Sequence, residues 1–208
     1  MRQLYFARHG ESEANVLAVI SNRGRVHGLT ATGRSQAEML AEKLRGNSFS
    51  HVYSSPLLRA IQTAEIVSRR LRLSFEVTDA LREYDCGLLE GCSDADSWQQ
   101  HRQLKDDWLV RKQWDKRIEQ GESFLDMRAR FVPFVEQLVE RSNNEPDANV
   151  LLIGHGGLYI CMLPLVLRNV SHAFALAQPF PNTGTVRAEL ESGKLWCREW
   201  CGGPVATP

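Results

Sequence analysis

The 208-residue sequence has no excess of charge of either sign, because 25 Lys and Arg residues are balanced by 25 Asp and Glu residues. A chain without a global basic field is not expected to bind nucleic acid or an anionic membrane surface. No apolar run has the length of a membrane-spanning helix, and residues 1–9 lack the apolar stretch of a secretory signal. We therefore expect neither nucleic acid nor a membrane as partner, while a local cationic pocket stays compatible with zero net charge.

Cysteine is scarce and odd in number, with five in the chain. An odd count without a secretory signal indicates reduced thiols in a cytoplasmic protein. The pairs Cys86–Cys92 and Cys197–Cys201 lack the spacing of zinc ligands, so the sequence predicts no metal site. We expect the five thiols to be buried or chemically idle.

What the chain does contain is apolar material, 43% of its residues, enough for the core of one large domain. Short β-prone runs predict strands over 3–8, 51–54, 73–78 and 149–153, and a terminal hairpin over 185–190 and 194–200. Helical spacing of apolar residues predicts helices over 30–45, 56–71, 94–117, from 123 onward, and 158–167. Pro56 is expected to open the second helix, and Pro133 to kink or interrupt the fourth.

This alternation predicts an α/β fold, a three-layer α/β/α sandwich around a mostly parallel sheet with an antiparallel edge strand. We expect a single domain over residues 1–201, with 93–120 inserted over one end of the sheet. Residues 202–208 are expected to be a disordered tail. Whether the chain forms a homodimer is left open.

Two histidines follow predicted strands: His9 after 3–8 and His155 after 149–153, each with a glycine behind it. Ligands of open α/β sheets bind outside the carboxyl ends of the strands, and glycine lets backbone N–H groups approach an anion. Arg8 precedes one histidine, and Arg59 lies near the start of a helix, where the dipole also favours an anion. A lone histidine there would more often be structural, but this set of four predicts a phosphate pocket.

Several short blocks of the sequence now match a known family. The first is Arg8-His9-Gly10-Glu11-Ser12 with Asn15, and further blocks are Leu29-Thr30 with Gly33, Gln36 and Ala37; Ser54-Ser55-Pro56-Leu57 with Arg59, Ala60, Thr63 and Ala64; Leu81-Arg82-Glu83; Glu90-Gly91; and Gly154-His155-Gly156. This order resembles the histidine phosphatase superfamily, the phosphoglycerate mutase-like proteins. The blocks span most of residues 4–157.

The resemblance implies that His9 is the nucleophile, attacking phosphorus through a neutral ring nitrogen. It implies that Arg8 and Arg59 hold the non-bridging oxygens and that His155 is a second imidazole donating to the phosphoryl group. Because these groups supply the positive charge, no metal or other cofactor is implied.

Asn15 and the Gly156 N–H are expected to add neutral donors. Ser12 has two readings that the sequence does not separate: it touches phosphate, or it only caps the helix that follows.

Glu83 is the candidate general acid, which protonates the leaving oxygen. Cationic neighbours and an anionic ligand would push its pKa in opposite directions, and the sequence leaves the balance open. A plain surface charge is the competing interpretation of Glu83. Glu11 and Asp85 are the alternative carboxylates, although Glu11 is expected to orient its loop and Asp85 to occupy a surface turn.

The same pocket supports two reactions, since the phosphoryl group on histidine passes either to water or to another hydroxyl of the substrate. Glycolytic mutases of the superfamily carry a longer insertion, with an arginine pair and a proline-rich stretch, and asparagine after the second His-Gly. This chain has neither feature clearly within 94–117, and it has Gly157 at the asparagine position. We therefore predict a phosphatase acting on a small-molecule phosphate monoester, with a mutase as alternative and a non-catalytic binding module as the second.

The insertion carries many charges, among them Arg102 and Lys105, and three tryptophans. It is typical of a solvated amphipathic helix, and the alternative is a lid that contacts an anionic or ring-bearing substrate. The pocket walls are expected to come from residues 16–28, 93–120 and 170–183.

Overall fold

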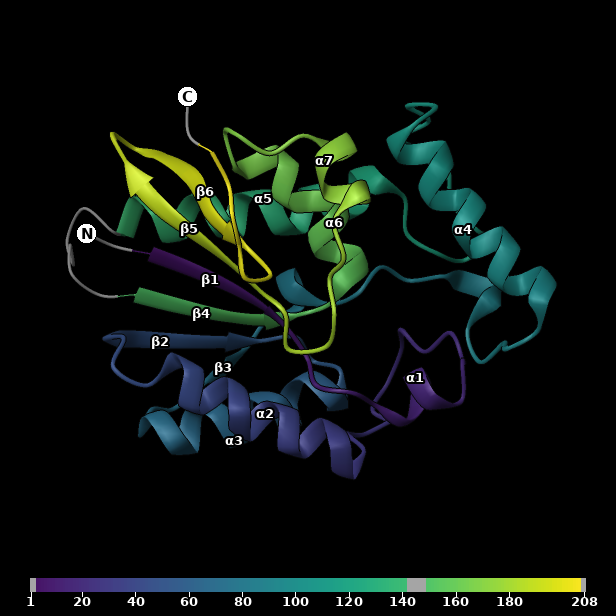
Figure 1. The fold of residues 1–208 in the computed structure, drawn as a ribbon. Helices are drawn as coiled ribbons and strands as arrows, with labels where there is room; N and C mark the ends of the chain where they lie inside the picture. Colours follow the sequence, from purple (N-terminus) through teal and green to yellow (C-terminus); the bar gives the residue numbers. More distant parts are fainter. Residues whose placement is uncertain (1–2, 142–148, 207–208) are drawn as a thin grey trace.

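The computed structural model describes residues 3–141 and 149–206. These residues form a seven-stranded sheet in the order β3-β2-β4-β1-β5-β6-β7 (Figure 1). The strands are β1 (Gln3–Arg8), β2 (Phe49–Ser54), β3 (Glu76–Val77), β4 (Asn149–Gly154), β5 (Thr185–Glu191), β6 (Lys194–Trp200) and β7 (Gly203–Pro204). The helices are α1 (Glu13–Val16), α2 (Ala31–Leu44), α3 (Leu58–Leu71), α4 (Ala95–Leu109), α5 (Phe124–Arg141), α6 (Gly156–Val166) and α7 (His172–Ala177), with 3-10 turns η1 (Asp79–Leu81) and η2 (Gly87–Leu89).

The predicted α/β sandwich is confirmed, but its antiparallel part is larger than the single edge strand we expected. β1, β2, β3 and β4 are parallel to one another, whereas β5, β6 and β7 add to β1 in antiparallel succession. The hairpin joins the sheet through β5, which pairs with β1, and β6 and then β7 follow outward. Over 73–78 only Glu76–Val77 forms a strand, because it pairs with just the last two residues of β2.

Side chains alternate between the two faces of the sheet and so create two cores. From β1, Tyr5 and Ala7 pack under α2 and α3, while Leu4 and Phe6 pack under α5 and α6. A strand buried on both faces is typical of parallel sheets covered by helices. Figure 1 shows α2 and α3 on one side of the sheet and α5 and α6 on the other.

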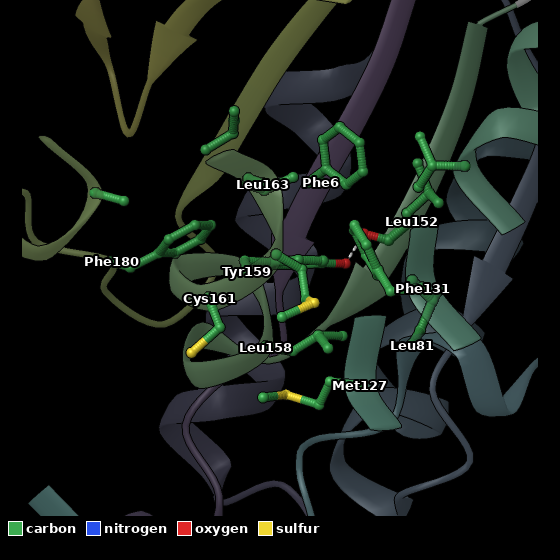
Figure 2. Close-up of a cluster of buried hydrophobic side chains, with 14 of the residues drawn as sticks. Phe6, Leu81, Met127, Phe131, Leu152, Leu158, Tyr159, Cys161, Leu163 and Phe180 are labelled. Atoms are coloured by element: carbon green, nitrogen blue, oxygen red, sulfur yellow. Dashed lines mark hydrogen bonds between the residues drawn. The ribbon is translucent and has the colours of Figure 1, made fainter. Parts of the chain in front are cut away.

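The core around α6 holds β1 and β4 in register (Figure 2). Tyr159 is completely buried against Phe6 and Phe131, and its hydroxyl donates to the Leu152 carbonyl at 2.8 Å. Full burial of each such side chain contributes about 1.5–3 kcal/mol. The register pairs Arg8 with Gly154, so the two strands end side by side.

The helix of the insertion is shorter than predicted, since α4 ends at Leu109. Asp94 caps its N-terminus by accepting the Ser97 N–H, and the chain beyond Leu109 folds back. Trp108 is fully buried and donates its indole N–H to the Lys116 carbonyl at 2.7 Å, which leaves 110–117 no room to continue the helix. In Figure 1, α4 and α1 lie beyond the carboxyl ends of the parallel strands.

Three further expectations need correction. Leu57, and not Pro56, is the residue that precedes α3, and α5 continues through Pro133, so an interruption there is wrong, while a kink stays a prediction. The disordered tail expected at 202–208 is wrong for Gly203–Pro204, which pairs with β6 because the chain reverses after Trp200; residues 207–208 lie outside the described residues. Within the described ranges, no helix combines the length and apolar character needed to cross a membrane.

Candidate active site

Strand register brings the two predicted histidines together. His9 follows β1 and His155 follows β4, the His9 N–H donates to the Gly154 carbonyl at 3.0 Å, and the two ring centroids are 5.0 Å apart. Arg59 reaches the same place from the first turn of α3. The rule that ligand-binding groups gather at the carboxyl edge of the sheet therefore holds for all three side chains.

The hydrogen bonds of His9 define which nitrogen carries the lone pair. Nδ1 lies 2.6 Å from the Gly10 carbonyl oxygen, which only accepts, so Nδ1 carries the proton. Nε2 accepts a hydrogen bond from Arg59 Nε at 3.1 Å. Burial, then the charges of Arg59 and Arg8, lowers the pKa of His9 well below 6.5, so the ring is neutral at physiological pH.

Two buried polar atoms at this site have no hydrogen-bond partner among the residues that the structure describes: Arg8 Nε and His155 Nδ1. Leaving a buried donor unpaired costs about 1–3 kcal/mol, and more for a charged group. Arg8 is otherwise held by its Nη1, which donates to the Phe180 carbonyl at 2.7 Å. Burial lowers the pKa of Arg59 to about 10, so both guanidinium groups stay charged at neutral pH. The arrangement suits an anion that accepts these donors.

The second histidine is positioned by Ser55, whose Oγ lies 2.7 Å from His155 Nε2. Ser55 Oγ already accepts the Leu57 N–H at 3.3 Å, so its own proton is free for Nε2. In the tautomer in which Ser55 Oγ donates to Nε2, the ring proton of His155 lies on Nδ1, the atom without a partner among the described residues. Burial first, and then the charge of Arg59, lowers the pKa of His155 well below its ordinary value.

Glu83 lines the cavity beside His9 and also caps α6. Its Oε2 accepts the Gly157 N–H at 3.0 Å and its Oε1 accepts the Tyr84 N–H at 3.2 Å. Burial raises the pKa of Glu83, and the Tyr84 N–H and the Arg59 charge only partly oppose it. In the unliganded protein, burial therefore outweighs the Arg59 charge at Glu83, and the effect of an anionic ligand stays a prediction.

Of the three carboxylates considered, Glu83 is the one whose residue lines the cavity. Glu11 accepts the Thr30 hydroxyl at 2.7 Å, which agrees with the expectation that it orients its loop. Asp85 forms an ion pair with Arg23 at 2.8 Å and is partly buried, so it is more than a surface turn residue.

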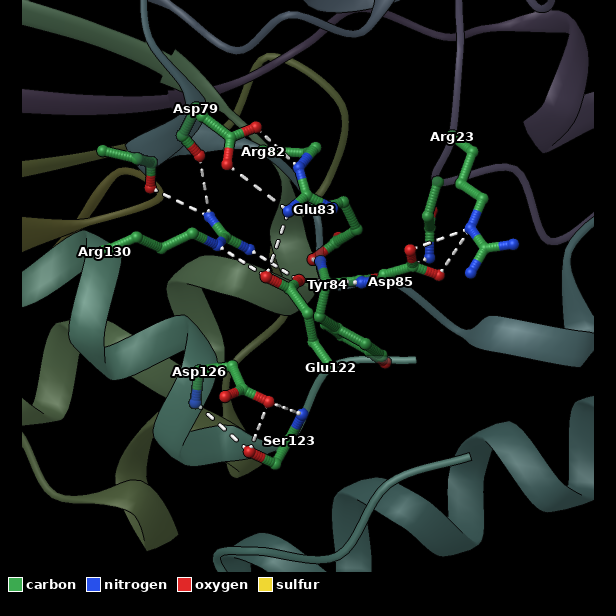
Figure 3. Close-up of polar contacts among 12 residues, drawn as sticks. Arg23, Asp79, Arg82, Glu83, Tyr84, Asp85, Glu122, Ser123, Asp126 and Arg130 are labelled. Atoms are coloured by element: carbon green, nitrogen blue, oxygen red, sulfur yellow. Dashed lines mark hydrogen bonds and ion pairs between the residues drawn. The ribbon is translucent and has the colours of Figure 1, made fainter. Parts of the chain in front are cut away.

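The segment that carries Glu83 is held by Glu122, which precedes α5, and by Arg130 of α5, a pair we call the clamp (Figure 3). Glu122 accepts the Asp85 N–H at 2.9 Å and forms ion pairs with Arg82 and Arg130 at 3.1 and 3.0 Å. Arg130 also donates to the carbonyl oxygens of the turn before Glu83, at 3.0 and 3.1 Å. Sequence reasoning missed this clamp, because nothing in the spacing of 82, 122 and 130 signals that they meet.

Asn15 and Ser12 have different positions. Asn15 lines the cavity, and its Oδ1 accepts from Ser12 N and Oγ (3.1 Å each) and from Asn182 Nδ2 (3.3 Å). Its Nδ2 thus has no partner within the described part of the chain and is a free donor. Ser12 is fully buried, precedes α1 and does not line the cavity, which favours the capping interpretation. Asn182, which belongs to the predicted wall segment 170–183 but does not line the cavity, also donates to the His9 carbonyl at 3.1 Å.

Gly156 and Gly157 open α6 at the cavity wall. A Cβ on Gly156 would lie 3.4 Å from Arg8 Cδ, and one on Gly157 would lie 2.7 Å from the Tyr84 ring and 2.8 Å from both Glu83 carboxylate oxygens. A Cβ on Gly156 would thus be in ordinary van der Waals contact, whereas one on Gly157 would require Glu83 or Tyr84 to move.

The cavity beside His9, Arg8, Arg59 and Glu83 has a volume of about 270 Å³, and His155 is not among its lining residues. Two of the three predicted wall segments are confirmed by several residues each, and 170–183 contributes Phe180 alone. Tyr84 and Ile160 also line it, and neither was predicted. From the insertion come Trp98, His101 and Lys105, but not Arg102, which is exposed.

Within the described residues, no group of three or more His, Cys, Asp or Glu side chains is arranged to hold a metal ion. The site is thus an anion pocket on an α/β sheet, built from two buried histidines and two arginines.

Comparison with known proteins places the chain in a family. The sequence matches the histidine phosphatase superfamily (branch 1) over residues 4–202. The chain therefore belongs to the histidine phosphatase superfamily.

Individual relatives carry names from both reaction classes. The chain is 34% identical over 167 residues to a probable phosphoglycerate mutase of Proteus mirabilis, a match that covers 80% of this chain and 75% of that protein. It is 35% identical over 174 residues to a 6-phosphofructo-2-kinase/fructose-2,6-bisphosphatase of Mus musculus, covering 80% of this chain and 33% of that protein. The solved structure of a mycobacterial glucosyl-3-phosphoglycerate phosphatase with VO3 is similar at a TM-score of 0.82 and 27% identity, covering 98% of this chain and 100% of that one.

Proposed function

We propose that the protein is a phosphatase that hydrolyses a small phosphate monoester through a phosphohistidine on His9. The observation that carries the proposal is the pair of hydrogen bonds on the His9 ring. Because Nδ1 donates to the Gly10 carbonyl, the lone pair of the neutral ring lies on Nε2, on the side of Arg59. A nucleophile with a fixed tautomer, next to a guanidinium that attracts phosphate oxygens, is the arrangement that phosphoryl transfer needs.

In the first step, the phosphoryl group displaces Arg59 from His9 Nε2 and takes the guanidinium groups of Arg8 and Arg59 as its own partners. Nε2 attacks phosphorus, the P–O bond to the leaving group breaks, and the leaving oxygen takes a proton from Glu83. His155 Nδ1 and Asn15 Nδ2 donate to the non-bridging oxygens as their negative charge redistributes.

In the second step, water attacks phosphorus from the side that the leaving group vacated. Glu83, now ionised, accepts a proton from that water while the P–N bond breaks and its electron pair returns to Nε2. The neutral ring and the protonated carboxyl group are both restored, so the cycle consumes only ester and water.

Hydrolysis is favoured over mutase chemistry by the packing at Gly157. Glycolytic mutases have asparagine at this point, but here the carboxylate of Glu83 and the ring of Tyr84 occupy the space of any side chain. The name of the Proteus mirabilis relative makes a mutase the second candidate. Interconversion of 3-phosphoglycerate in the presence of 2,3-bisphosphoglycerate would identify it.

The proposal is tested by turnover of p-nitrophenyl phosphate, with and without EDTA, by the purified protein and by His9→Ala. We expect hydrolysis that survives chelation and disappears in the variant. Absence of turnover across a broad panel of phosphate esters would contradict the proposal and favour a binding module.

We also propose a cytoplasmic location, because all five cysteines are free and three of them are buried. Free thiols are typical of reducing compartments. Fractionation of cells that express the tagged protein tests this directly.

A further inference from the structure

A tight turn over residues 180–184, between α7 and β5, contacts the active site from outside the cavity. The Gly184 N–H donates to the Pro181 carbonyl at 2.9 Å and closes the turn. Thr183, at its corner, has a φ of 55°, in the left-handed region that a β-branched residue rarely adopts. Such a conformation persists only where the surrounding contacts determine it, so the turn has a fixed shape.

The turn is anchored both in the core and in the sheet. The ring of Phe180 is buried, with its centroid 5.7 Å from that of Tyr159 and 5.4 Å from that of Trp200. The Phe180 carbonyl accepts Arg8 Nη1 at 2.7 Å, and the Gly184 carbonyl accepts the Arg8 N–H at 3.0 Å. The backbone of the turn is therefore fixed relative to the end of β1.

From this position the turn holds two more residues of the site. The His9 carbonyl accepts the Thr183 N–H at 3.2 Å and Asn182 Nδ2 at 3.1 Å. The same Asn182 nitrogen donates to Asn15 Oδ1 at 3.3 Å. The bonds from Arg8 and Thr183 to and from the turn use its backbone, whereas those of Asn182 use a side chain. The Asn182 bonds therefore depend on which residue occupies this position.

The amide of Asn15 is oriented by the donors around its oxygen. Besides Asn182, Oδ1 accepts the Ser12 N–H and the Ser12 hydroxyl at 3.1 Å each. A backbone N–H only donates, so Oδ1 faces Ser12 and Nδ2 is left as the donor. The Ser12 bonds place this amide relative to α1, and the Asn182 bond joins it to the end of β1, where His9 lies. Asn15 lines the cavity and Asn182 does not.

We propose that Asn182 is a positioning residue, which fixes the Asn15 amide relative to His9 so that both meet the same phosphoryl group. This inference rests on the proposed phosphatase function and adds to it a residue outside the cavity. When the Asn182 side chain is removed, the His9 carbonyl keeps the Thr183 N–H, but the Asn15 amide loses its bond to the turn. The effect of Asn182 on catalysis should therefore pass through Asn15.

Two replacements separate the amide donors from the shape of the side chain. Asn182→Ala removes both, whereas Asn182→Leu removes the donors and keeps nearly the same volume. We expect kcat/KM for p-nitrophenyl phosphate to fall about fivefold to tenfold in each, the usual worth of one neutral hydrogen bond. A full rate in Asn182→Leu would overturn the proposal, because the donors would then be dispensable.

A matched control is Asn169→Ala, which removes an asparagine of similar engagement that does not line the cavity. The Asn169 amide donates to the Cys197 carbonyl at 2.9 Å and accepts the Cys197 N–H at 2.8 Å. Its loss should lower the urea midpoint and leave kcat/KM unchanged. A similar fall of kcat/KM in Asn169→Ala would show that loss of stability alone explains the Asn182 variants, and would overturn the positioning role.

A double-mutant cycle with Asn15→Ala identifies the route of the effect. Beside Asn15→Ala, the further replacement Asn182→Leu should lower kcat/KM less than about twofold, because its target is already gone. Losses that add in full would overturn the proposal, while leaving hydrolysis on His9 intact.

Binding of orthovanadate, measured by calorimetry, repeats this cycle without turnover and separates the proposal from the phosphatase assignment. We expect Asn182→Leu to weaken vanadate binding about fivefold to tenfold with Asn15 present and less than about twofold in Asn15→Ala. That result supports the proposal even if no ester is hydrolysed. Vanadate affinity that Asn182→Leu leaves unchanged overturns the positioning role alone, and a wild-type protein that binds no vanadate overturns both proposals.

Discussion

Replacement of Glu83 by glutamine separates the two roles that the structure gives this side chain. The carboxylate caps α6 through the Gly157 N–H and also lines the cavity beside His9. Glutamine keeps one oxygen acceptor but has no proton to give to a leaving group. The substitution therefore preserves most of the cap and removes the acid.

The expected magnitudes differ widely for these two roles. One of the two backbone hydrogen bonds to the side chain is lost, which costs about 1 kcal/mol of folding free energy. Loss of a general acid lowers the rate about 10²- to 10⁴-fold, or about 3–5 kcal/mol of activation free energy. The rate loss should be large for an alkyl phosphate and small for p-nitrophenyl phosphate, whose leaving group needs little help from an acid.

The pH dependence carries a definite sign. Burial raises the pKa of Glu83, so its protonated form persists above the ordinary range and activity falls as pH rises through the raised value. Glu83→Gln should lose this limb in kcat/KM for an alkyl phosphate. For stability, a raised carboxyl pKa means that the folded protein binds more protons than the unfolded chain, so stability falls as pH rises from the unfolded to the folded pKa. The variant should lack that decline in urea unfolding, and this contribution partly offsets the lost hydrogen bond.

Equal rate losses for the two leaving groups, with the limb still present in the variant, would refute the assignment of Glu83 as the acid. An unfolding midpoint far below that of wild type would instead show that the cap dominates.

Three more substitutions test other parts of the site. Arg59→Lys keeps the charge but loses the guanidinium fork, so kcat/KM should fall about 10²-fold while urea unfolding changes little; an unchanged kcat/KM would exclude Arg59 from the phosphate contacts. Gly157→Asn should lower the free energy of unfolding by about 1–3 kcal/mol, because its Cβ meets Glu83 and Tyr84, and unchanged stability would show that the site has room for the mutase residue. Arg130→Met should cost about 3 kcal/mol in urea unfolding by leaving Glu122 partly unpaired, and should shift the Glu83 limb of the pH profile; an unshifted limb would limit the clamp to stability.

The parts of the fold and site that the sequence predicted depend on local pattern. β1 and β4 are short apolar runs, β5 and β6 are joined by a Ser-Gly turn, and the glycine after each histidine marks the strand end. Once a parallel sheet is assumed, the meeting of His9 and His155 follows from the rule for its carboxyl edge.

What escaped prediction depends on contacts between distant segments. β7 belongs to the sheet because it pairs with β6. Its residues Gly203 and Pro204 do not predict a strand, since both residue types are rare in strands. Lys105 lines the cavity and Arg102 does not, because of how α4 is rotated against the cavity. The charged residues of α4 form no stripe along the helix from which this rotation could be predicted. The hydrogen bond that Glu122 accepts from Asp85, next to the Glu83 segment, likewise joins residues 37 positions apart in the sequence.

The proposed mechanism depends above all on the covalent phosphohistidine that forms on His9. Wild-type protein mixed with phosphate-labelled substrate and quenched in alkali within a turnover should yield a peptide with one phosphoryl group on His9 that is stable in base and lost in acid. In oxygen-labelled water, one label should enter the released phosphate. Turnover without an adduct, an adduct on another residue, or full activity in His9→Ala would contradict it.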